Sequence, residues 1–359
     1  MHAQKVRLGF IGAGWWATAN HIPILAQRDD VELTALCRLG ADELRKVKER
    51  FGFQFATEDA AELVRQPLDA VVVTSPHTLH YEHAKLALER GLHVMCDKPM
   101  CTVGAQAVEL VRLAAEKNLH LLVPYGWHYK PFVQQAKMWM DAGGVGYVQY
   151  ALCHMASPIR DLLTGGRFSV ERNSGQAGGA MFDPDPKTWS DPQVAGGGYG
   201  HAQLSHATGM LCWLTGLMPH SVFAQMTAPG SAVDLYDAIS VRFENGAIGT
   251  VSGAGTMPAT GVGAYQVDLR IFGTEGVLLL DLERARLELR RHDGKHQKID
   301  LPPDSGAYEC TQPPQNFIDL IVGKSAINYA PGEAAMRSVL LLDAAYRSAA
   351  SGRLEMVQL

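Results

Sequence analysis

The stretch VRLGFIGAGWWA, residues 6–17, decides how the N-terminal part of this chain folds. Its first six residues form a short apolar run typical of a buried strand, and Gly12, Gly14 and Ala17 follow at the start of a predicted helix. Gly12 permits a tight turn, Gly14 lets backbone N–H groups approach an anion, and Ala17 keeps the helix close to the strand. The spacing predicts a pyrophosphate-binding turn and a dinucleotide cofactor; a purely structural turn is the alternative.

Outward from this stretch, residues 5–123 alternate short apolar runs with amphipathic helical segments. Strands are predicted at 6–11, 31–36, 70–75, 93–96 and 120–123, and helices at 42–51, 80–91 and 107–118. This alternation is typical of a parallel sheet covered by helices on both faces. We therefore predict an α/β dinucleotide-binding domain over residues 1–125, with the doubly wound Rossmann arrangement.

The pattern changes in residues 126–359, for which we predict an α+β domain that binds substrate and forms oligomers. Segments 145–157 and 220–300 read as strands joined by turns, and ENGA (244–247) and HDGK (292–295) are hairpin signals. These features predict a mostly antiparallel open sheet, which a Gly/Pro/Asp-rich loop at 164–198 interrupts. We expect the closing helix, 333–352, to pack back on the first domain.

Bulk composition limits the possible partners and compartments. The chain has 359 residues, of which 47% are hydrophobic and 19% are charged, and its net charge is −5. Two domains are expected at this length, and the charge argues against nucleic acid or an anionic membrane as a partner. The six cysteines show no C-x-x-C pair and no apolar run approaches ~20 residues, and we expect no signal peptide before the first strand. We expect reduced thiols in a cytoplasmic protein.

The second predicted strand ends in TALCRLGAD, residues 34–42, which places Arg38 where a carboxylate would usually bind the ribose 2′-hydroxyl. An arginine cannot accept a hydrogen bond from that hydroxyl, but it can pair with a 2′-phosphate. The sequence therefore favours NADP over NAD within an NAD(P)(H) cofactor. The alternative is that Arg38 stacks on the adenine and leaves both cofactors acceptable.

The most specific passage is TSPHTLHYEHAKLALERGLHVMCDKPM, residues 74–100. Its Pro76, His77 and His80, its ALERGLHV segment and its Asp97-Lys98-Pro99 resemble the Gfo/Idh/MocA family of sugar and inositol oxidoreductases. The resemblance continues through VPYGWHYKP, 123–131, and through the GGG…H…WLTG segment, 196–216, and covers essentially the whole chain.

The resemblance implies that Lys98 reaches between nicotinamide and substrate, and that the peptide bond before Pro99 is cis. Independently, Lys98 follows a parallel strand at its carboxyl end, where open α/β sheets hold ligands. A surface lysine paired with Asp97 is the alternative. The resemblance also implies that His206 exchanges a proton with a substrate hydroxyl while Lys98 polarises the reacting oxygen. A helix-interior histidine bonded to backbone is the alternative for His206.

The family usually carries an aspartate four residues before this histidine, and here that position is Ala202. We expect a replacement from the same helical face or from the long loop. The candidates are His201, Gln203, Asp183, Asp185 and Asp191. The glycines at 196–198 are expected to allow a close approach of backbone to ligand.

Further side chains are expected to line a sugar pocket, with ordinary packing as the alternative for each. These are Tyr125, Trp127, His128, His201 and Trp189. The residues expected at the cofactor are Gly12, Gly14, Trp15, Trp16, Arg38, Ser75, Pro76, His77, His80 and Lys98. His77, His80 and His83 recur every three residues, but without a carboxylate or cysteine partner they predict no metal site.

By this resemblance the chain is expected to be an NAD(P)-dependent oxidoreductase that moves hydride between nicotinamide C4 and a secondary hydroxyl of a neutral cyclic polyol. A pyranose or glycoside, oxidised for example at the 3-position, or an inositol is expected, and a homo-oligomer, dimer or tetramer, is implied. One alternative is a glycosidase that oxidises transiently and eliminates, with His201 serving the additional proton transfer. Another is a non-catalytic NADP(H)-binding sensor.

Overall fold

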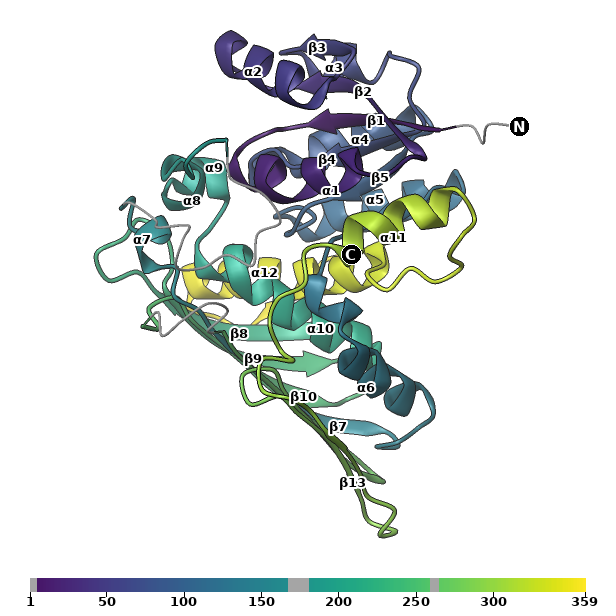
Figure 1. Ribbon diagram of the computed structural model, residues 1–359. Helices are drawn as coiled ribbons and strands as arrows, with labels where there is room; N and C mark the ends of the chain where they lie inside the picture. The colour runs from purple at the N-terminus through teal and green to yellow at the C-terminus, as the bar shows by residue number, and fades with distance from the viewer. Residues whose placement is uncertain (1–4, 167–180, 259–264) are drawn as a thin grey trace.

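The computed structural model describes residues 5–166, 181–258 and 265–359. They contain two β-sheets with their helices, and one sheet lies beyond the other along the molecule (Figure 1). The first sheet has six strands in the order β3-β2-β1-β4-β5-β6, and every neighbouring pair is parallel. The strands are β1 (Val6–Ile11), β2 (Val31–Cys37), β3 (Phe55–Thr57), β4 (Ala70–Val73), β5 (His93–Cys96) and β6 (Leu121–Leu122). The predicted Rossmann sheet is confirmed, and β3 is an edge strand that the sequence analysis did not identify.

Helices cover both faces of this parallel sheet. They are η1 (Ala17–His21), α1 (Ile22–Ala26), α2 (Ala41–Phe51), α3 (Ala60–Leu63), η2 (His77–Leu79), α4 (His80–Glu89) and α5 (Gly104–Glu116). Helix α2 illustrates the local reason: Asp42 and Glu43 lie in its first turn and Lys48 and Arg50 in its last, which favours the helix dipole at both ends.

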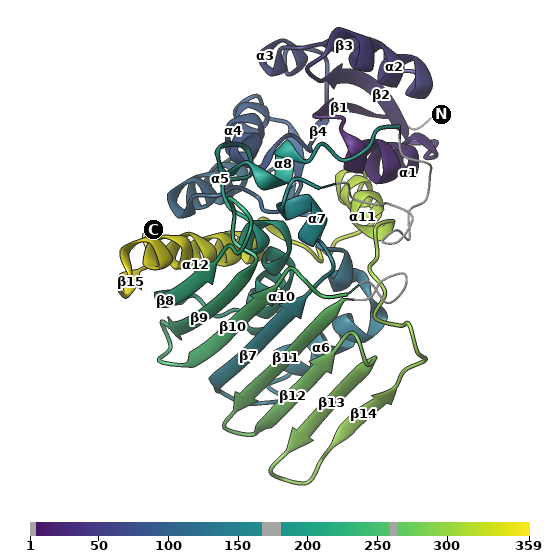
Figure 2. The same cartoon turned by 90° about the vertical axis from the view of Figure 1, so that its left-hand side faces the viewer.

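The second sheet has nine strands in the order β14-β13-β12-β11-β7-β10-β9-β8-β15 (Figure 2). The strands are β7 (Val148–Ala156), β8 (Pro219–Thr227), β9 (Tyr236–Phe243), β10 (Ile248–Ala254), β11 (Gln266–Gly273), β12 (Gly276–Asp281), β13 (Arg286–Arg291), β14 (Gln297–Asp300) and β15 (Glu355–Met356). Within the described ranges, β7 and β10 are the one parallel pair, and both predicted hairpin turns join antiparallel strands. The prediction of a mostly antiparallel sheet is confirmed.

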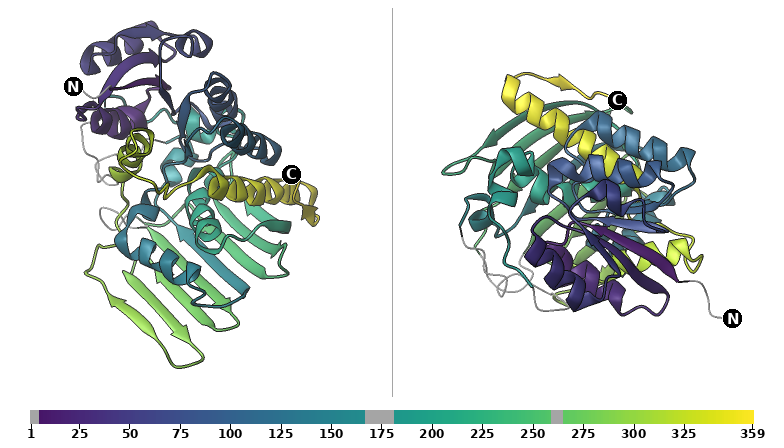
Figure 3. Two further views of the ribbon diagram at one scale, coloured as in Figure 1. Left: turned by 90° about the vertical axis from the view of Figure 1, so that its right-hand side faces the viewer. Right: turned by 90° about the horizontal axis from the view of Figure 1, so that it is seen from above.

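The two faces of the second sheet differ in their cover. Helices α6 (Pro131–Asp141), α10 (Ser205–Thr215) and α12 (Gly332–Ser351) pack on one face, as Figures 1 and 3 show. The other face exposes large apolar side chains from several strands. They are Phe223, Tyr236, Ile248 and Phe272, which are each 39–52% exposed.

The C-terminal segment packs against both halves of the protein. Helix α12 lies against α5 of the first half and against α10 and β8 of the second (Figure 3). Helix α11 (Gln312–Ile321) contacts α1 and β5, and its Phe317 and Ile318 are fully buried in the core of the first sheet. The sequence analysis did not anticipate this role of α11. None of the helices in the described ranges combines the length and apolar character that a membrane crossing requires.

Candidate active site

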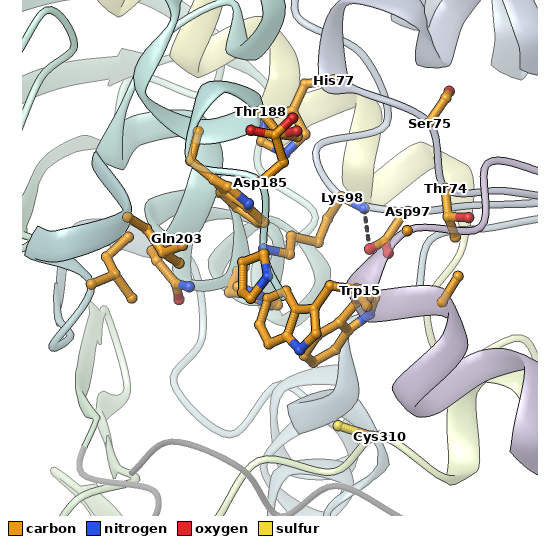
Figure 4. Close-up of a pocket in the computed structure, with 18 of the residues that line it drawn as sticks. Trp15, Thr74, Ser75, His77, Asp97, Lys98, Asp185, Thr188, Gln203 and Cys310 are labelled. Atoms are coloured by element: carbon orange, nitrogen blue, oxygen red, sulfur yellow. Dashed lines mark hydrogen bonds between the residues drawn. The ribbon is translucent and has the colours of Figure 1, made fainter. Parts of the chain in front are cut away.

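A cavity of about 270 Å³ lies at the carboxyl ends of the first sheet, where segments of the second half close over it (Figure 4). Most of the residues predicted from the sequence line it. They are Gly14, Trp15, Trp16, Arg38, Ser75, His77, His80, Lys98, Trp127, Trp189 and His206. The cavity is thus built from the turn after β1, the ends of β2, β4 and β5, and the start of α10.

The two glycines after β1 serve different purposes. Gly12 has φ +92°, and a Cβ atom there would lie 2.5 Å from the carbonyl carbon of Thr74, so this glycine is required by the fold itself. A Cβ atom on Gly14 would meet no atom within 4 Å, and Gly14 borders the cavity. The turn therefore leaves open space at the start of a helix, which fits the pyrophosphate of a dinucleotide.

Arg38 follows β2 and turns its guanidinium over the ring of Phe182, at 4.2 Å from the ring centroid. Its Nη1 donates to the carbonyl oxygen of Ala13 at 2.5 Å, whereas its buried Nε has no partner in the described part of the chain. Burial lowers the pKa of Arg38, and the more distant charge of Glu43 opposes this only in part. A half-buried cation at the cavity wall without a paired carboxylate among the described residues fits an anionic ligand.

Lys98 follows β5, and the Lys98–Pro99 peptide bond is cis, as the resemblance implies. Its side chain runs away from Asp97 toward the side of the cavity that carries Gln203 (Figure 4), and Nζ donates to the carbonyl oxygen of Ala202 at 2.6 Å. Burial lowers the pKa of Lys98 to about 8, although the neighbouring Asp97 carboxylate acts in the opposite direction.

His80 holds the two loops beside Lys98 together. Its Nδ1 lies 2.7 Å from the carbonyl oxygen of Pro99, and its Nε2 lies 2.6 Å from the carbonyl oxygen of Ser75. His77 contacts the long loop instead, through the carbonyl oxygen of Ala195 at 3.2 Å and the edge of the Trp189 ring. In the ranges that the structure describes, no group of three His, Cys, Asp or Glu residues is arranged to hold a metal ion.

His206 lies in the first turn of α10 with 6% of its surface exposed. Its ring is surrounded by Tyr125, Trp127 and Tyr308, at centroid distances of 6.0, 5.4 and 5.2 Å. Its Nδ1 is buried and has no hydrogen-bond partner among the described residues. Burial, and secondly the charge of Lys98, lower the pKa of His206 well below its usual value.

The glycine-rich segment before α10 packs against protein, which corrects the expectation of a close approach to ligand. The Asp234 carboxylate accepts hydrogen bonds from the amides of Gly198 at 2.7 Å and Gly200 at 2.9 Å. A Cβ atom on Gly198 would lie 2.2 Å from the carbonyl oxygen of Asp234, and one on Gly197 would lie 2.5 Å from the ring of Tyr346. These glycines let the chain approach β9 and α12 closely.

After these glycines, residues Gly200–Leu204 form the π-helical turn η5. This turn contains His201 and Gln203, two of the candidates to replace the family aspartate. Gln203, Asp183 and Asp185 line the cavity, whereas Asp191 caps α9 (Pro192–Ala195) by accepting from the amide of Gln193. Ala202 contributes its carbonyl oxygen to Lys98 rather than a side chain.

Several residues predicted to line the site lie elsewhere. His201 stacks on Tyr346 at 4.4 Å, and His128 stacks on Trp213 at 4.5 Å and bonds to the carbonyl oxygen of Tyr329. Tyr125 is buried in the first core and reaches only the edge of His206. Gly12 and Pro76 are not among the described residues that line the cavity. Because their rings are used in packing, His201, His128 and Tyr125 are not available to a ligand in this arrangement.

The cavity also has aromatic walls that sequence analysis missed. Phe182 precedes α8 (Lys187–Ser190), Tyr265 lies at the start of β11, and Tyr308 follows β14. The hydroxyl of Tyr308 donates to the carbonyl oxygen of Pro124 and accepts from the amide of Gly126, both at 3.2 Å, so it presents ring rather than hydroxyl to the cavity. No motif in the sequence marks these three positions.

Comparisons with known proteins agree with this architecture. Residues 6–125 match a model described as "Oxidoreductase family, NAD-binding Rossmann fold", and residues 133–279 match "GFO/IDH/MocA C-terminal domain". D-glucoside 3-dehydrogenase of Escherichia coli (strain K12) is 34% identical over 131 residues, which is 36% of this chain and only 37% of that enzyme. Levoglucosan dehydrogenase of Pseudarthrobacter phenanthrenivorans is 26% identical over 78% of this chain and 75% of its own length.

Among solved structures, levoglucosan dehydrogenase in complex with NADH and L-sorbose superposes with a TM-score of 0.75, at 20% identity over 99% of this chain and 100% of that one. A structure of GenD2 from gentamicin A biosynthesis, in complex with NAD, gives a TM-score of 0.72 at 20% identity, over 100% of this chain and 98% of that one. These likenesses show the shared fold. Together with the two family matches, they establish that this chain belongs to the Gfo/Idh/MocA family of oxidoreductases.

Proposed function

We propose that this protein is an NAD(P)-dependent dehydrogenase that oxidises a ring hydroxyl of a neutral sugar, such as the 3-hydroxyl of a glucoside, or of an inositol. The observation that carries the proposal is one cavity bordered by the open turn at Gly14, by Lys98 and by His206. When bound, the cofactor would supply the acceptor for the hydride that leaves the substrate carbon. Lys98 and His206 would hold the reacting oxygen and manage its proton.

The substrate class follows from the walls of the cavity. Trp127 and Tyr308 meet edge to face at 4.8 Å, and the polar groups of both are tied to backbone, the indole N–H of Trp127 to Gly306. Their rings therefore offer apolar surface, which suits the C–H face of a pyranose. Gln203 and Asp185, which also line the cavity, can bond to hydroxyl groups. The relatives named D-glucoside 3-dehydrogenase and levoglucosan dehydrogenase support a sugar.

We propose NADP as the preferred cofactor because Arg38 presents a buried, unpaired guanidinium nitrogen where the cofactor's adenosine end would lie. A 2′-phosphate would give this cation the counter-charge that it lacks in the described structure. The matched relatives include one protein named for NADP(+) and structures holding NAD or NADH, so the family allows either cofactor.

The experiment that tests the function measures cofactor binding and turnover together. Quenching of tryptophan fluorescence by NADP⁺ and NAD⁺ reports binding, because Trp15 and Trp16 border the cavity. Formation of reduced cofactor is then followed with methyl glucosides, levoglucosan, free aldoses and inositols. Oxidation of a neutral cyclic polyol supports the proposal, and binding of cofactor without turnover on any of them would favour the sensor alternative.

The glycosidase alternative depended on His201 as an additional proton carrier. Because His201 stacks on Tyr346 outside the cavity, this alternative has lost its supporting residue. Release of free sugar from a glycoside with no net change in cofactor oxidation state would restore it.

We also propose that the chain forms a homo-oligomer through the outer face of the second sheet. Ile248 and Phe272 lie on that face, in register with Tyr150 between them, and both are at least 40% exposed. Such a row of apolar side chains is typical of a protein interface. Light scattering behind size-exclusion chromatography, on the wild type and an Ile248→Glu variant, measures whether the mass falls to that of one chain.

A further inference from the structure

We infer that Lys98, and not His206, exchanges the substrate proton, while His206 stays neutral and acts only as a hydrogen-bonding group. This assignment rests on the proposed function and reverses the roles that the sequence suggested. It follows from the partners that the structure gives to each of the two side chains.

A protonated His206 would carry two N–H groups and a positive charge into a closed aromatic surrounding. Its Nδ1 has no acceptor in the described ranges, and rings of Tyr125, Trp127 and Tyr308 surround it. A buried N–H without an acceptor and a buried charge without a bonded partner both carry a free-energy cost. No carboxylate within the described chain hydrogen-bonds to this imidazole, and position 202 is alanine; the Asp97 carboxylate acts only through space and opposes the lowering of the His206 pKa in part.

A protonated Lys98, in contrast, has partners already in place. Its Nζ donates to the Ala202 carbonyl oxygen at 2.6 Å, whereas the Asp97 carboxylate, from which the side chain runs away, favours the ammonium only through space. The acceptor is a neutral main-chain oxygen in the π-helical turn rather than a carboxylate. A carbonyl partner holds the ammonium in position without a full negative charge that would keep the proton on it. Lys98 can therefore both take up and release a proton near neutral pH, as a proton carrier must.

The proposed step balances as follows. In oxidation the O–H bond of the substrate hydroxyl breaks, and its proton passes to the lone pair of Nζ to give an ammonium. The oxygen forms a second bond to carbon while the hydride on that carbon leaves to the nicotinamide that the proposed function supplies. In reduction the ammonium returns the proton to the oxygen. His206 donates or accepts one hydrogen bond throughout without changing its charge.

The pH profiles of kcat/KM in two variants distinguish Lys98 from His206 as the group that exchanges the proton. His206→Gln keeps a neutral hydrogen-bonding group, and we expect kcat/KM for oxidation to fall about 10- to 100-fold while still rising with pH through a midpoint near 8, as in the wild type. Lys98→Arg keeps the positive charge but cannot lose its proton, so we expect a loss of about 10²- to 10⁴-fold with no rising limb. In Lys98→Ala, neutral methylamine should restore part of the rate. A rising limb that disappears in His206→Gln, or rescue of His206→Ala by imidazole together with no amine rescue of Lys98→Ala, overturns the inference.

A second measurement does not depend on turnover. Nitrogen NMR of histidine-labelled protein, with His206→Gln used to assign the signal, should show a neutral His206 ring from about pH 9 to about pH 6. Protonation of His206 within this range overturns the inference. Because the spectrum needs neither substrate nor cofactor, a protein that shows a neutral His206 but oxidises no polyol refutes the proposed function and not the charge state of this histidine.

Discussion

Replacing Asp234 with alanine should destabilise the protein strongly, because this carboxylate holds the start of the helix that carries His206. Its two oxygens accept hydrogen bonds at 2.7 and 2.9 Å from the amides of Gly198 and Gly200, and 7% of the residue is exposed. The substitution leaves two buried N–H groups without an acceptor, each at a cost of about 1–3 kcal/mol. We therefore expect the free energy of unfolding to fall by about 2–6 kcal/mol, a large share of the ~5–15 kcal/mol typical of folded proteins.

Chemical unfolding followed by tryptophan fluorescence and by far-UV circular dichroism gives this free energy, provided both probes report the same transition. Asp234→Asn is the matched control, because one amide oxygen can still accept from one of the two glycines. Its loss should lie between zero and that of the alanine variant. A loss below about 1 kcal/mol for Asp234→Ala would refute the reasoning, since it would mean that the two amides find other acceptors.

Three further predictions follow from the same structure. Burial and the charge of its neighbouring aspartate raise the pKa of Asp237 well above its usual value, so the folded protein binds this proton more tightly than the unfolded chain. The wild type should therefore lose stability as pH rises above the pKa of this group in the unfolded chain. In thermal scans, the melting temperature of Asp237→Asn should exceed that of the wild type by a margin that grows from about pH 5 to about pH 8. Arg38→Ala should weaken NADP⁺ binding about 10- to 100-fold while leaving the NAD⁺ dissociation constant nearly unchanged; equal effects on both in a fluorescence titration would contradict the role of the 2′-phosphate. Gly14→Val should abolish cofactor binding at an unchanged melting temperature, because a Cβ atom there meets nothing within 4 Å. Gly12→Ala should instead lower stability by at least about 2 kcal/mol, because φ is +92° and its Cβ would lie 2.5 Å from backbone.

The first half of the chain was the more predictable from sequence. Strands β1, β2, β4 and β5 are mostly apolar and mostly buried, as is typical of strands that helices cover on both faces. The edge strand β3, Phe55–Thr57, escaped detection because a strand of three residues is too short to carry a periodic signal. The packing of helix α11 in the first core was not predicted, since its apolar face does not say which sheet it covers.

The candidate site was predictable where a motif reports local backbone geometry. The turn at Gly14 and the lysine after β5 are such cases, and both border the cavity. The placement of His201 failed because, at 3.6 residues per turn, a side chain five residues before His206 does not share its face on a regular α-helix. In the structure the His201 ring stacks on Tyr346 instead.

Other contributions to the site depend on long-range packing that no local pattern encodes. Tyr308 reaches His206 and Trp127 from a loop that lies about 100 residues after the first and about 180 residues after the second along the chain. Asp234 fixes the glycine segment from the loop just before β9, and nothing in its own sequence surroundings marks this role. Such contacts depend on how the two sheets are placed relative to each other, and no local pattern in a single sequence specifies that placement.

The return of α11 into the first core limits how this protein can be divided or recombined. Phe317, Ile318 and Leu320 are at most 6% exposed there, and Val339 of α12 joins them. A fragment that stops near residue 125 would leave the groove for these side chains open to water, and would be prone to aggregate. A chimera that transplants the nucleotide-binding half onto another catalytic half should therefore carry residues 312–339 with it, because the structural unit is discontinuous along the chain.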